Sequence, residues 1–236
     1  MIRKSFSWWR DFHYWLKFNL GYSRLFYYII YANKNPYKRM AVSRESNICI
    51  EGYPRSSNSY AVVAFHLANE NVRIAHHHHV LAQIYKSMDY HIPIITVIRK
   101  PEDAITSFLI FQRSFNVDLY IKTYTQYYKR IISLHDQMII ADFDTVVNNF
   151  NKVINAVNVK YNSNYRIINN LEYRQNEIFG KLSEVNKIYF RGDKNKLMFP
   201  DDEREKLKHA LKEHVMKNKY LNFANTIYKK ILEYAV

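Results

Sequence analysis

Three polar segments near the middle of the chain carry the side chains best suited to chemistry. They are GYPRSSNSY at residues 52–60, four consecutive histidines at residues 76–79, and RKPEDAITS at residues 99–107. The first and third segments combine an arginine with hydroxyl side chains, a pairing that binds phosphate groups. A histidine has a near-neutral pKa and can accept the proton of an alcohol. These residue types favour group transfer that involves a phosphorylated ligand.

Each polar segment follows a short apolar run with the composition of a buried β-strand. Helical periodicity lies between these runs, so strands and helices alternate along the chain. Such alternation predicts an α/β layered domain in which right-handed crossovers connect parallel strands. Ligands of such sheets bind beyond the carboxyl ends of the strands, which is where the three polar segments fall. The expected strands are residues 47–51, 72–75, 93–98 and 138–141, and the expected helices are residues 60–67, 80–90, 101–111, 119–134 and 145–157.

The first polar segment has the form of a strand, a tight loop and a helix N-terminus. This arrangement binds anions because free amides and the helix dipole both point at the ligand. In the ATP-binding pattern G-x-x-x-x-G-K-[ST], Gly52 and Ser59 fit. Ser57 and Asn58 replace the second glycine and the lysine, whereas Arg55 places a cation earlier in the loop. A nucleotide kinase or NTPase with a degenerate phosphate loop is therefore an alternative that the missing lysine disfavours.

Together, the first and third segments resemble the two nucleotide motifs of sulfotransferases that use 3′-phosphoadenosine 5′-phosphosulfate (PAPS). The first resembles the 5′-phosphosulfate loop G-[YF]-P-[KR]-S-G-[TN]-[TS]-[WY], from whose second glycine Ser57 departs. Arg99 with Ser107 eight positions later resembles the 3′-phosphate motif. The likeness spans about residues 46–112. It implies a three-layer α/β domain with a central parallel sheet, of the P-loop-containing nucleoside triphosphate hydrolase-like (sulfotransferase) fold.

The resemblance implies transfer of a sulfuryl group from PAPS to a hydroxyl or amine of an acceptor. Arg55 would stabilise the leaving 5′-phosphate, and Arg99 with Ser107 would identify the 3′-phosphate. Arg191, in the basic sequence FRGDKNK, resembles a further 3′-phosphate element, although an ordinary basic loop explains it equally well. The acceptor is expected to be a glycan, a lipid-linked sugar or a small alcohol. The residues implied to bind PAPS are Pro54, Arg55, Ser56, Ser57, Asn58, Ser59, Tyr60, Arg99, Ser107 and Arg191.

The histidines are the candidates for the general base. In the family a histidine at about this position deprotonates the acceptor, and His79 holds the best-matching place, with His77 as the second candidate. If the segment is extended, His77 and His79 point to one side and His76 and His78 to the other. A polar strand end or a metal site are the other interpretations. No metal is predicted, because adjacent histidines cannot all reach one ion and no nearby Cys or Asp completes a ligand set.

Composition narrows the classes of partner. The chain of 236 residues is long enough to bury a core, and its single cysteine, Cys49, excludes an internal disulfide framework. A net charge of +14 favours an anionic partner: a nucleotide, a nucleic acid, an acidic glycan or a membrane surface. A basic nucleic-acid-binding protein is thus a further alternative, although no sequence signature beyond charge supports it. Another alternative is a sulfotransferase-like protein that binds nucleotide but has no catalytic activity.

The N-terminus differs from the rest of the chain. Residues 1–40 contain eight basic side chains against Asp11 alone, and all three tryptophans lie there. We expect residues 1–45 to form a basic, aromatic, helical segment packed on an α/β domain of residues 46–236. Solvated cations on packed helices are one interpretation of this segment, and peripheral contact with an anionic membrane is the other. The protein is expected to be cytoplasmic, since the longest uncharged stretch here is far too short to span a bilayer.

Overall fold

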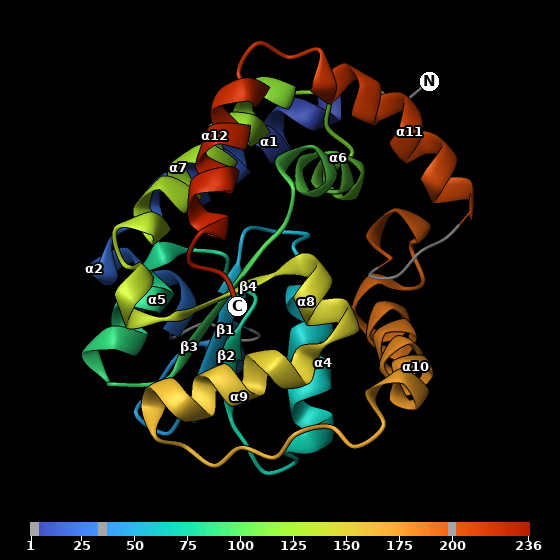
Figure 1. The fold of residues 1–236 in the computed structure, drawn as a ribbon. Helices are drawn as coiled ribbons and strands as arrows, with labels where there is room; N and C mark the ends of the chain where they lie inside the picture. The colour runs from blue at the N-terminus through green and yellow to red at the C-terminus, as the bar shows by residue number, and fades with distance from the viewer. Residues whose placement is uncertain (1–4, 33–36, 198–201) are drawn as a thin grey trace.

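A sheet of four parallel strands forms the centre of the protein, with helices on both of its faces (Figure 1). The computed structural model describes residues 5–32, 37–197 and 202–236. The strands are β1 (Ile48–Gly52), β2 (Ile74–His76), β3 (Ile94–Ile98) and β4 (Ile139–Asp142), in the spatial order β2-β1-β3-β4. They coincide closely with the four apolar runs, so the predicted α/β architecture with a central parallel sheet is confirmed.

The strands form because their residues are apolar and meet a packed layer on each side. β1 and β3 are buried along their whole length. Alternate side chains point to opposite faces of a strand, so Cys49 packs on one side of the sheet whereas Ile48 and Ile50 pack on the other. Neighbouring strands pair in parallel, and Ile50 pairs with both His76 and Ile95. All four carboxyl ends therefore lie at the same edge of the sheet.

The strand order reverses between β1 and β3. From β1 the chain passes through α4 (Asn58–Ala68) to β2 at one end of the sheet, and from β2 it passes through α5 (Leu81–Asp89) to β3 on the other side of β1. The loops after β1 and β3 thus leave in opposite directions. In open α/β sheets such a reversal opens a crevice at the carboxyl edge, where ligands bind.

Helices cover the sheet in two layers. One layer contains α5, α6 (Pro101–Gln112), α7 (Val117–Ile132) and α12 (Leu221–Leu232), with α1 (Ser5–Leu20) against α7. The other contains α4, α8 (Phe143–Asn148), α9 (Phe150–Tyr161) and α10 (Leu171–Phe190). α11 (Asp202–Met216) packs on α6, and short 3₁₀ turns form η2 (His135–Gln137) and η3 (Lys194–Lys196). The single helix expected at residues 145–157 is wrong: the chain forms α8 and α9, because the backbone of Asn149 leaves the helical region.

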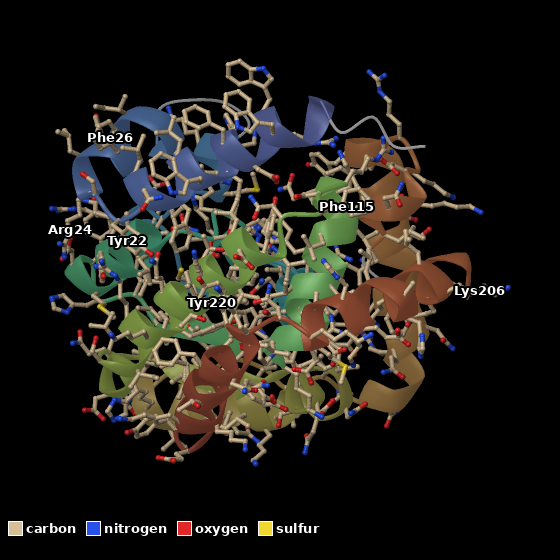
Figure 2. All side chains as sticks on the ribbon, turned by 90° about the horizontal axis from the view of Figure 1, so that it is seen from above. Tyr22, Arg24, Phe26, Phe115, Lys206 and Tyr220 are labelled. Atoms are coloured by element: carbon tan, nitrogen blue, oxygen red, sulfur yellow. The ribbon has the colours of Figure 1, made fainter. Side chains whose placement is uncertain are left out.

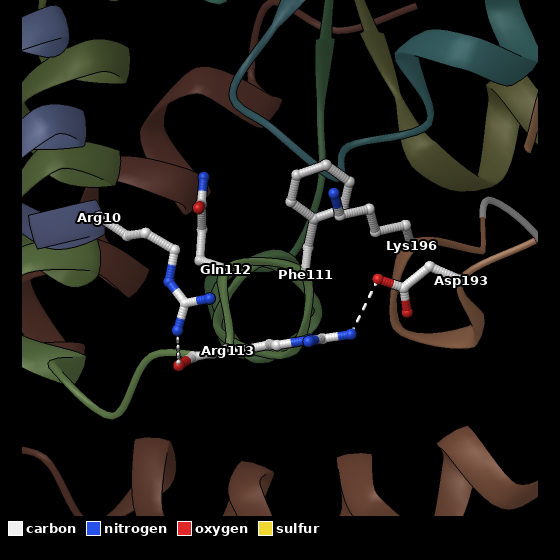
Figure 3. A pocket seen from close by; sticks show the side chains of 6 residues that line it. All are labelled: Arg10, Phe111, Gln112, Arg113, Asp193 and Lys196. Carbon is white, nitrogen blue, oxygen red and sulfur yellow. Dashed lines mark hydrogen bonds and ion pairs between the residues drawn. The ribbon is translucent and has the colours of Figure 1, made fainter. Parts of the chain in front are cut away.

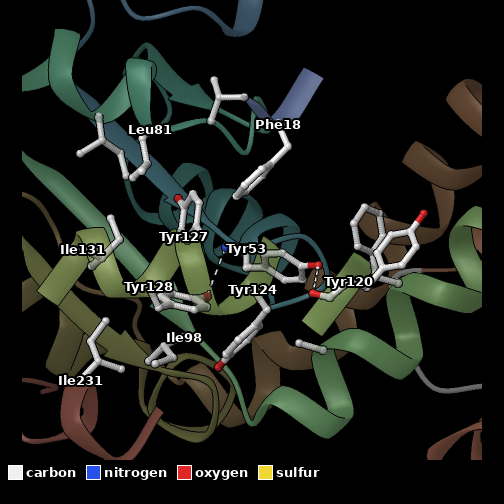
Figure 4. Packing of buried hydrophobic residues seen from close by; sticks show 14 of the residues in the cluster. Phe18, Tyr53, Leu81, Ile98, Tyr120, Tyr124, Tyr127, Tyr128, Ile131 and Ile231 are labelled. Atoms are coloured by element: carbon white, nitrogen blue, oxygen red, sulfur yellow. Dashed lines mark hydrogen bonds between the residues drawn. The ribbon is translucent and has the colours of Figure 1, made fainter. Parts of the chain in front are cut away.

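The two layers enclose cores of different composition. The aliphatic core, under α4, α8, α9 and α10, consists mainly of Ile, Val and Ala and contains one buried tyrosine, Tyr60. The tyrosine core, under the other layer, contains eight (Figure 4). Three of these line up at i, i+4 spacing on α7, which places them on one side of that helix. The eight are Tyr14, Tyr27, Tyr31, Tyr53, Tyr120, Tyr124, Tyr127 and Tyr128.

The N-terminal helices lie on the tyrosine core. They are α1, α2 (Arg24–Tyr27), the π-helical turn η1 (Tyr28–Ala32) and α3 (Tyr37–Met40). Tyr14 and Phe18 of α1 are buried in this core, and the amide of Ala82 at the start of α5 donates to the Gly21 carbonyl oxygen at 2.9 Å. No helix in the described part of the chain has both the length and the apolar character needed to cross a bilayer.

Candidate functional site

The loop between β1 and α4 has a backbone suited to anion binding. Arg55 and Ser57 both have left-handed conformations, with φ of 69° and 73°. Left-handed residues in a loop that enters a helix can turn backbone amides toward one side and form an anion-binding concavity. Glycine adopts this conformation without strain, whereas other residues are penalised by their Cβ. Ser57 therefore holds a conformation that glycine would adopt without strain.

Gly52 and Asn58 fix the shape of the loop between β1 and α4. A Cβ on Gly52 would lie 2.3 Å from the Val97 carbonyl oxygen and 2.7 Å from Asn58 Oδ1, so only glycine allows this close approach of β1 and β3. Asn58 is buried, and its Nδ2 donates to the Tyr53 carbonyl oxygen at 3.0 Å. The position that carries lysine in the ATP-binding pattern is thus occupied by a side chain that closes the loop.

Arg55 is the centre of a cluster drawn from three segments. Its Nε donates to Ser107 Oγ of α6 at 3.0 Å, and its Nη2 donates to the Leu197 carbonyl oxygen. Arg99, which follows β3, donates from Nη1 to the Arg55 carbonyl oxygen at 3.1 Å. The structure therefore brings together the predicted residues Arg55, Arg99 and Ser107. Arg55 contacts both Arg99 and Ser107 and so joins these two residues.

Tyrosines of α7 hold both loops of this cluster in place. The backbone amide of Tyr53 donates to the Tyr128 hydroxyl oxygen at 3.2 Å, and that hydroxyl also lies 3.3 Å from Ser56 Oγ. Tyr124 donates its hydroxyl to the Arg99 carbonyl oxygen at 2.7 Å. Figure 4 shows Tyr124 and Tyr128 near Tyr53, with the hydrogen bond between Tyr53 and Tyr128 as a dashed line. A buried tyrosine is suited to this role because it combines a large apolar ring with a hydroxyl that needs a partner.

The four histidines lie where β2 ends, but they do not alternate as expected. His77 and His79 have left-handed backbones, with φ of 59° and 55°, because the strand stops at His76. The prediction that His76 and His77 point to opposite sides is wrong: their Nδ1 atoms contact each other and their ring centroids are 4.6 Å apart. His78 turns away from both and lies 4.7 Å from the ring of Tyr31.

His79 has the geometry of a general base. Its Nδ1 lies 2.8 Å from the Gly52 carbonyl oxygen, which can only accept, so Nδ1 carries the proton and Nε2 keeps its lone pair. Among the described residues, Nε2 of His79 has no hydrogen-bond partner. Burial holds the pKa of His79 well below its usual range, so the ring is neutral at pH 7. His77, the second candidate, has its Nε2 at 2.7 Å from Ser59 Oγ.

Glu51 is a site residue that sequence reasoning missed. This buried carboxylate accepts hydrogen bonds from the backbone amides of His78 and His79, at 2.8 and 3.1 Å, and from Gln83 Nε2 at 2.7 Å. Burial raises its pKa to about 7 although these donors act in the opposite direction. Its Oε2 lies 3.6 Å from Nδ1 of His79, so Glu51 positions the histidine loop. The signal was a single charged residue inside the apolar run at residues 47–51.

The remaining predicted residues lie close to the loop, with one exception. Pro54 is buried, and Tyr60 donates its hydroxyl to the Val147 carbonyl oxygen at 3.1 Å. Arg191 is exposed at the end of α10, and among the described residues no contact joins it to Arg99 or Ser107. The geometry therefore does not place Arg191 in the cluster around Arg55.

A different cation of the same basic loop reaches the cluster. Lys196 lies 5.6 Å from the ring centroid of Phe111, and the Arg55 guanidinium lies 5.5 Å from the same centroid. Phe111 also lines a pocket of about 150 Å³ between α1, the end of α6 and η3 (Figure 3). The pocket is basic, since three of its six lining residues are cations and one is an acid. Its lining residues are Arg10, Phe111, Gln112, Arg113, Asp193 and Lys196.

Comparisons with known proteins identify no relative of this chain. No protein-family model matches the chain, and neither the curated proteins nor the solved structures include a match. Because one fold can host many activities, function has to be inferred from the side chains at the carboxyl edge of the sheet.

Proposed function

We propose that this protein is a PAPS-dependent sulfotransferase with the sulfotransferase version of the P-loop fold. One observation carries the proposal. At the reversal between β1 and β3, a loop with left-handed residues at Arg55 and Ser57 meets Arg99 and Ser107 from the next strand and helix. This is the place where open α/β sheets bind ligands, and the residue types suit a ligand with several phosphate groups.

The residues around Arg55 fit both phosphorylated ends of the donor. Arg55 now binds neutral oxygens of Ser107 and Leu197, and an anionic phosphate oxygen would form stronger, charge-assisted bonds with the same guanidinium. The first amides of α4 have no preceding turn to bond to and are available for the 5′-phosphosulfate. Arg99 and Ser107 would hold the 3′-phosphate. Lys196, 5.6 Å from the ring centroid of Phe111, adds positive charge nearby.

In the proposed reaction, an acceptor hydroxyl attacks the sulfur of PAPS. A bond forms between the acceptor oxygen and sulfur, and the bond between sulfur and the 5′-phosphate oxygen breaks. Nε2 of His79 takes the acceptor's proton. Arg55 and the loop amides stabilise the negative charge on the departing adenosine 3′,5′-bisphosphate, and Glu51, at 3.6 Å, stabilises the imidazolium. Positioning and electrostatics dominate, because such a transfer needs little covalent chemistry from the protein.

A nucleotide kinase or NTPase fits the same site less well. In that class a lysine at the end of the phosphate loop reaches the β- and γ-phosphates. Here the corresponding side chain, Asn58, is buried and bonded to the Tyr53 carbonyl oxygen. The acceptor of the proposed transfer remains a hydroxyl or amine compound, with a glycan or a lipid-linked sugar as the favoured classes.

Calorimetric titration of the full chain with adenosine 3′,5′-bisphosphate, AMP and ATP tests the proposal. We expect micromolar binding of the bisphosphate and at least about tenfold weaker binding of AMP, because AMP lacks the 3′-phosphate. Arg99→Ala should remove this preference. Lys100→Ala is the matched control, since the neighbouring Lys100 is an exposed cation whose loss changes the net charge equally. Equal binding of AMP and the bisphosphate contradicts the proposal, and a preference for ATP supports the kinase alternative.

A further inference from the structure

The outer side of α1 is covered with exposed aromatic rings. Trp8, Trp9, Phe12 and Trp15 are 61%, 65%, 41% and 47% exposed. Trp8 stacks on Phe12 and Phe12 on Trp15, with ring centroids 5.8 and 6.0 Å apart, so these rings form a continuous strip. Figure 2 shows ring side chains standing away from the N-terminal helix at the edge of the molecule. We call these four rings, together with exposed Leu25, Tyr28 and Ile29 of α2 and η1, the aromatic face.

The protein does not need this face for its own packing. The inner side of α1 already fixes the helix: Asp11 accepts hydrogen bonds from Ser114 Oγ at 2.9 Å and from the Tyr120 hydroxyl at 3.0 Å. Tyr14 and Phe18, on the same side, are buried in the tyrosine core. α1 therefore carries large hydrophobic side chains on both its inner and its outer side, although only the inner side packs on the protein. Contiguous apolar surface of this kind usually marks an interaction site.

The charges around the aromatic face indicate what covers it. The sequence of residues 1–40 has eight cations and one acid, Asp11, which is buried in the hydrogen bonds just described. Three of the described cations are engaged within the protein: Arg10 donates to the Arg113 carbonyl oxygen, Lys17 lies over the Tyr31 ring and Arg24 pairs with Asp89. Lys38 and Arg39 of α3 are exposed, and α3 packs beside η1. Tryptophan and tyrosine prefer the headgroup level of a bilayer, and cations beside them attract anionic lipids. This combination fits an anionic membrane surface better than another protein.

We propose that the aromatic face docks on an anionic lipid membrane, with α1 lying in the plane of the interface. The helix does not insert across the bilayer, because none of the described helices can span one. Docking would hold the carboxyl edge of the sheet close to the lipid. Tyr14, on the inner side of α1, has its hydroxyl 3.4 Å from that of Tyr53, so α1 reaches the residue that opens the β1–α4 loop through a contact between two tyrosine side chains. Docking itself does not depend on the proposed transferase activity.

The three tryptophans provide the test, because all of them lie on the aromatic face. Vesicles of phosphatidylcholine with and without phosphatidylglycerol are titrated into the full-length protein, and tryptophan emission and co-sedimentation are measured. We expect a blue shift and at least about tenfold tighter binding to the anionic vesicles, weakened by high salt. Absence of a blue shift and of sedimentation with anionic vesicles overturns the proposal.

Two double variants show whether the aromatic face is responsible. Trp8→Ser/Trp15→Ser should reduce sedimentation with anionic vesicles at least about tenfold. Ile188→Ser/Tyr189→Ser is the matched control, since these residues are 73% and 69% exposed on α10, and it should sediment like wild type. Circular dichroism verifies that both variants are folded. Unchanged sedimentation of the tryptophan variant contradicts the proposal, as does a dimer in analytical ultracentrifugation that the same variant abolishes, because a second copy would then cover the face.

Discussion

The two sides of the sheet are built from different residues. The aliphatic core contains a single buried tyrosine among the described residues, whereas the tyrosine core places eight in an apolar layer and directs several of their hydroxyls at the loops of the candidate site. Tyr128 reaches the loop after β1, and Tyr124 reaches the loop after β3. One side of the sheet therefore mainly provides cohesion, whereas the other also positions the carboxyl edge.

The largest expected effect comes from the aliphatic core. Phe150→Ala should lower the free energy of unfolding by about 3–5 kcal/mol, because Phe150 is fully buried and the variant leaves a cavity. The folded fraction should bind adenosine 3′,5′-bisphosphate as wild type does. Urea unfolding and calorimetry measure the two quantities, with Ile154→Val as a milder variant, for which we expect about 0.5–1.5 kcal/mol. Weakened nucleotide binding in the folded variant would contradict the division between the cores.

Acidification should also have a large effect, through the carboxyl edge. Burial lowers the pKa of His77 from 6.5 to about 4, with help from nearby Arg55, and holds those of His76 and His79 well below 6.5. Between pH 6.5 and 4 the unfolded chain therefore binds protons that the folded chain does not. The stability that these histidines provide is present above pH 6.5 and is lost as the pH falls, by up to about 3 kcal/mol for His77 alone.

Glu51 acts in the opposite direction. Its pKa rises from 4.5 to about 7 on folding, so between these values the folded chain holds a proton that the unfolded chain lacks, and acidification is stabilising at this residue. Three histidines outweigh one carboxylate, and we expect a net loss of stability below pH 6.5. Urea unfolding across this range should show a shallower loss for His77→Asn and a steeper loss for Glu51→Gln. A wild-type stability that rises on acidification would refute this balance.

A smaller loss of stability is expected when the hydroxyl of one of two neighbouring tyrosines is removed. Tyr128→Phe removes a hydroxyl that donates to the Val97 carbonyl oxygen at 2.8 Å and accepts from the Tyr53 amide, so we expect a loss of about 1–3 kcal/mol and weaker nucleotide binding. Tyr127 is the matched control, because its buried hydroxyl has no partner among the described residues. Tyr127→Phe should be neutral or stabilising. Equal losses in the two variants would show that the hydroxyl of Tyr128 has no special role.

The smallest expected effect is a gain in stability. Ser57→Gly should stabilise the protein by up to about 1 kcal/mol, because glycine adopts a φ of 73° without the penalty that a Cβ imposes. The serine side chain makes no capping hydrogen bond that would be lost. Ser57→Ala keeps the Cβ and should show no gain in thermal unfolding. Destabilisation by glycine would mean that the loop is not left-handed at this residue.

The strands and their carboxyl edge could be predicted because buried parallel strands are continuous apolar runs that end in polar loops. The convergence of Arg55, Arg99 and Ser107 followed from the same reasoning, since parallel strands bring their following loops together. The contact of Arg55 with both Arg99 and Ser107 did not follow from the motifs, because it depends on how the long Arg55 side chain packs.

Other features depend on backbone angles and tertiary contacts that a sequence pattern does not contain. Because the backbone of His77 is left-handed, the histidine side chains do not point alternately to opposite sides as expected. Tyr128 was visible only as one residue of an amphipathic helix, and its reach to the loop depends on how α7 packs on the sheet. Glu51 gave a signal, a charge within an apolar strand, but only its three donors reveal that it positions the histidine loop.

The central claim is that a nucleotide with a 3′-phosphate binds at the carboxyl edge between β1 and β3. Hydrogen–deuterium exchange with adenosine 3′,5′-bisphosphate, beside AMP, tests it most directly because the measurement locates the ligand. We predict that amides of residues 53–60 and 99–107 exchange at least about tenfold more slowly with the bisphosphate, while α9 in the aliphatic core is unaffected. Protection confined to other segments, or equal protection of residues 99–107 by AMP, would contradict the claim.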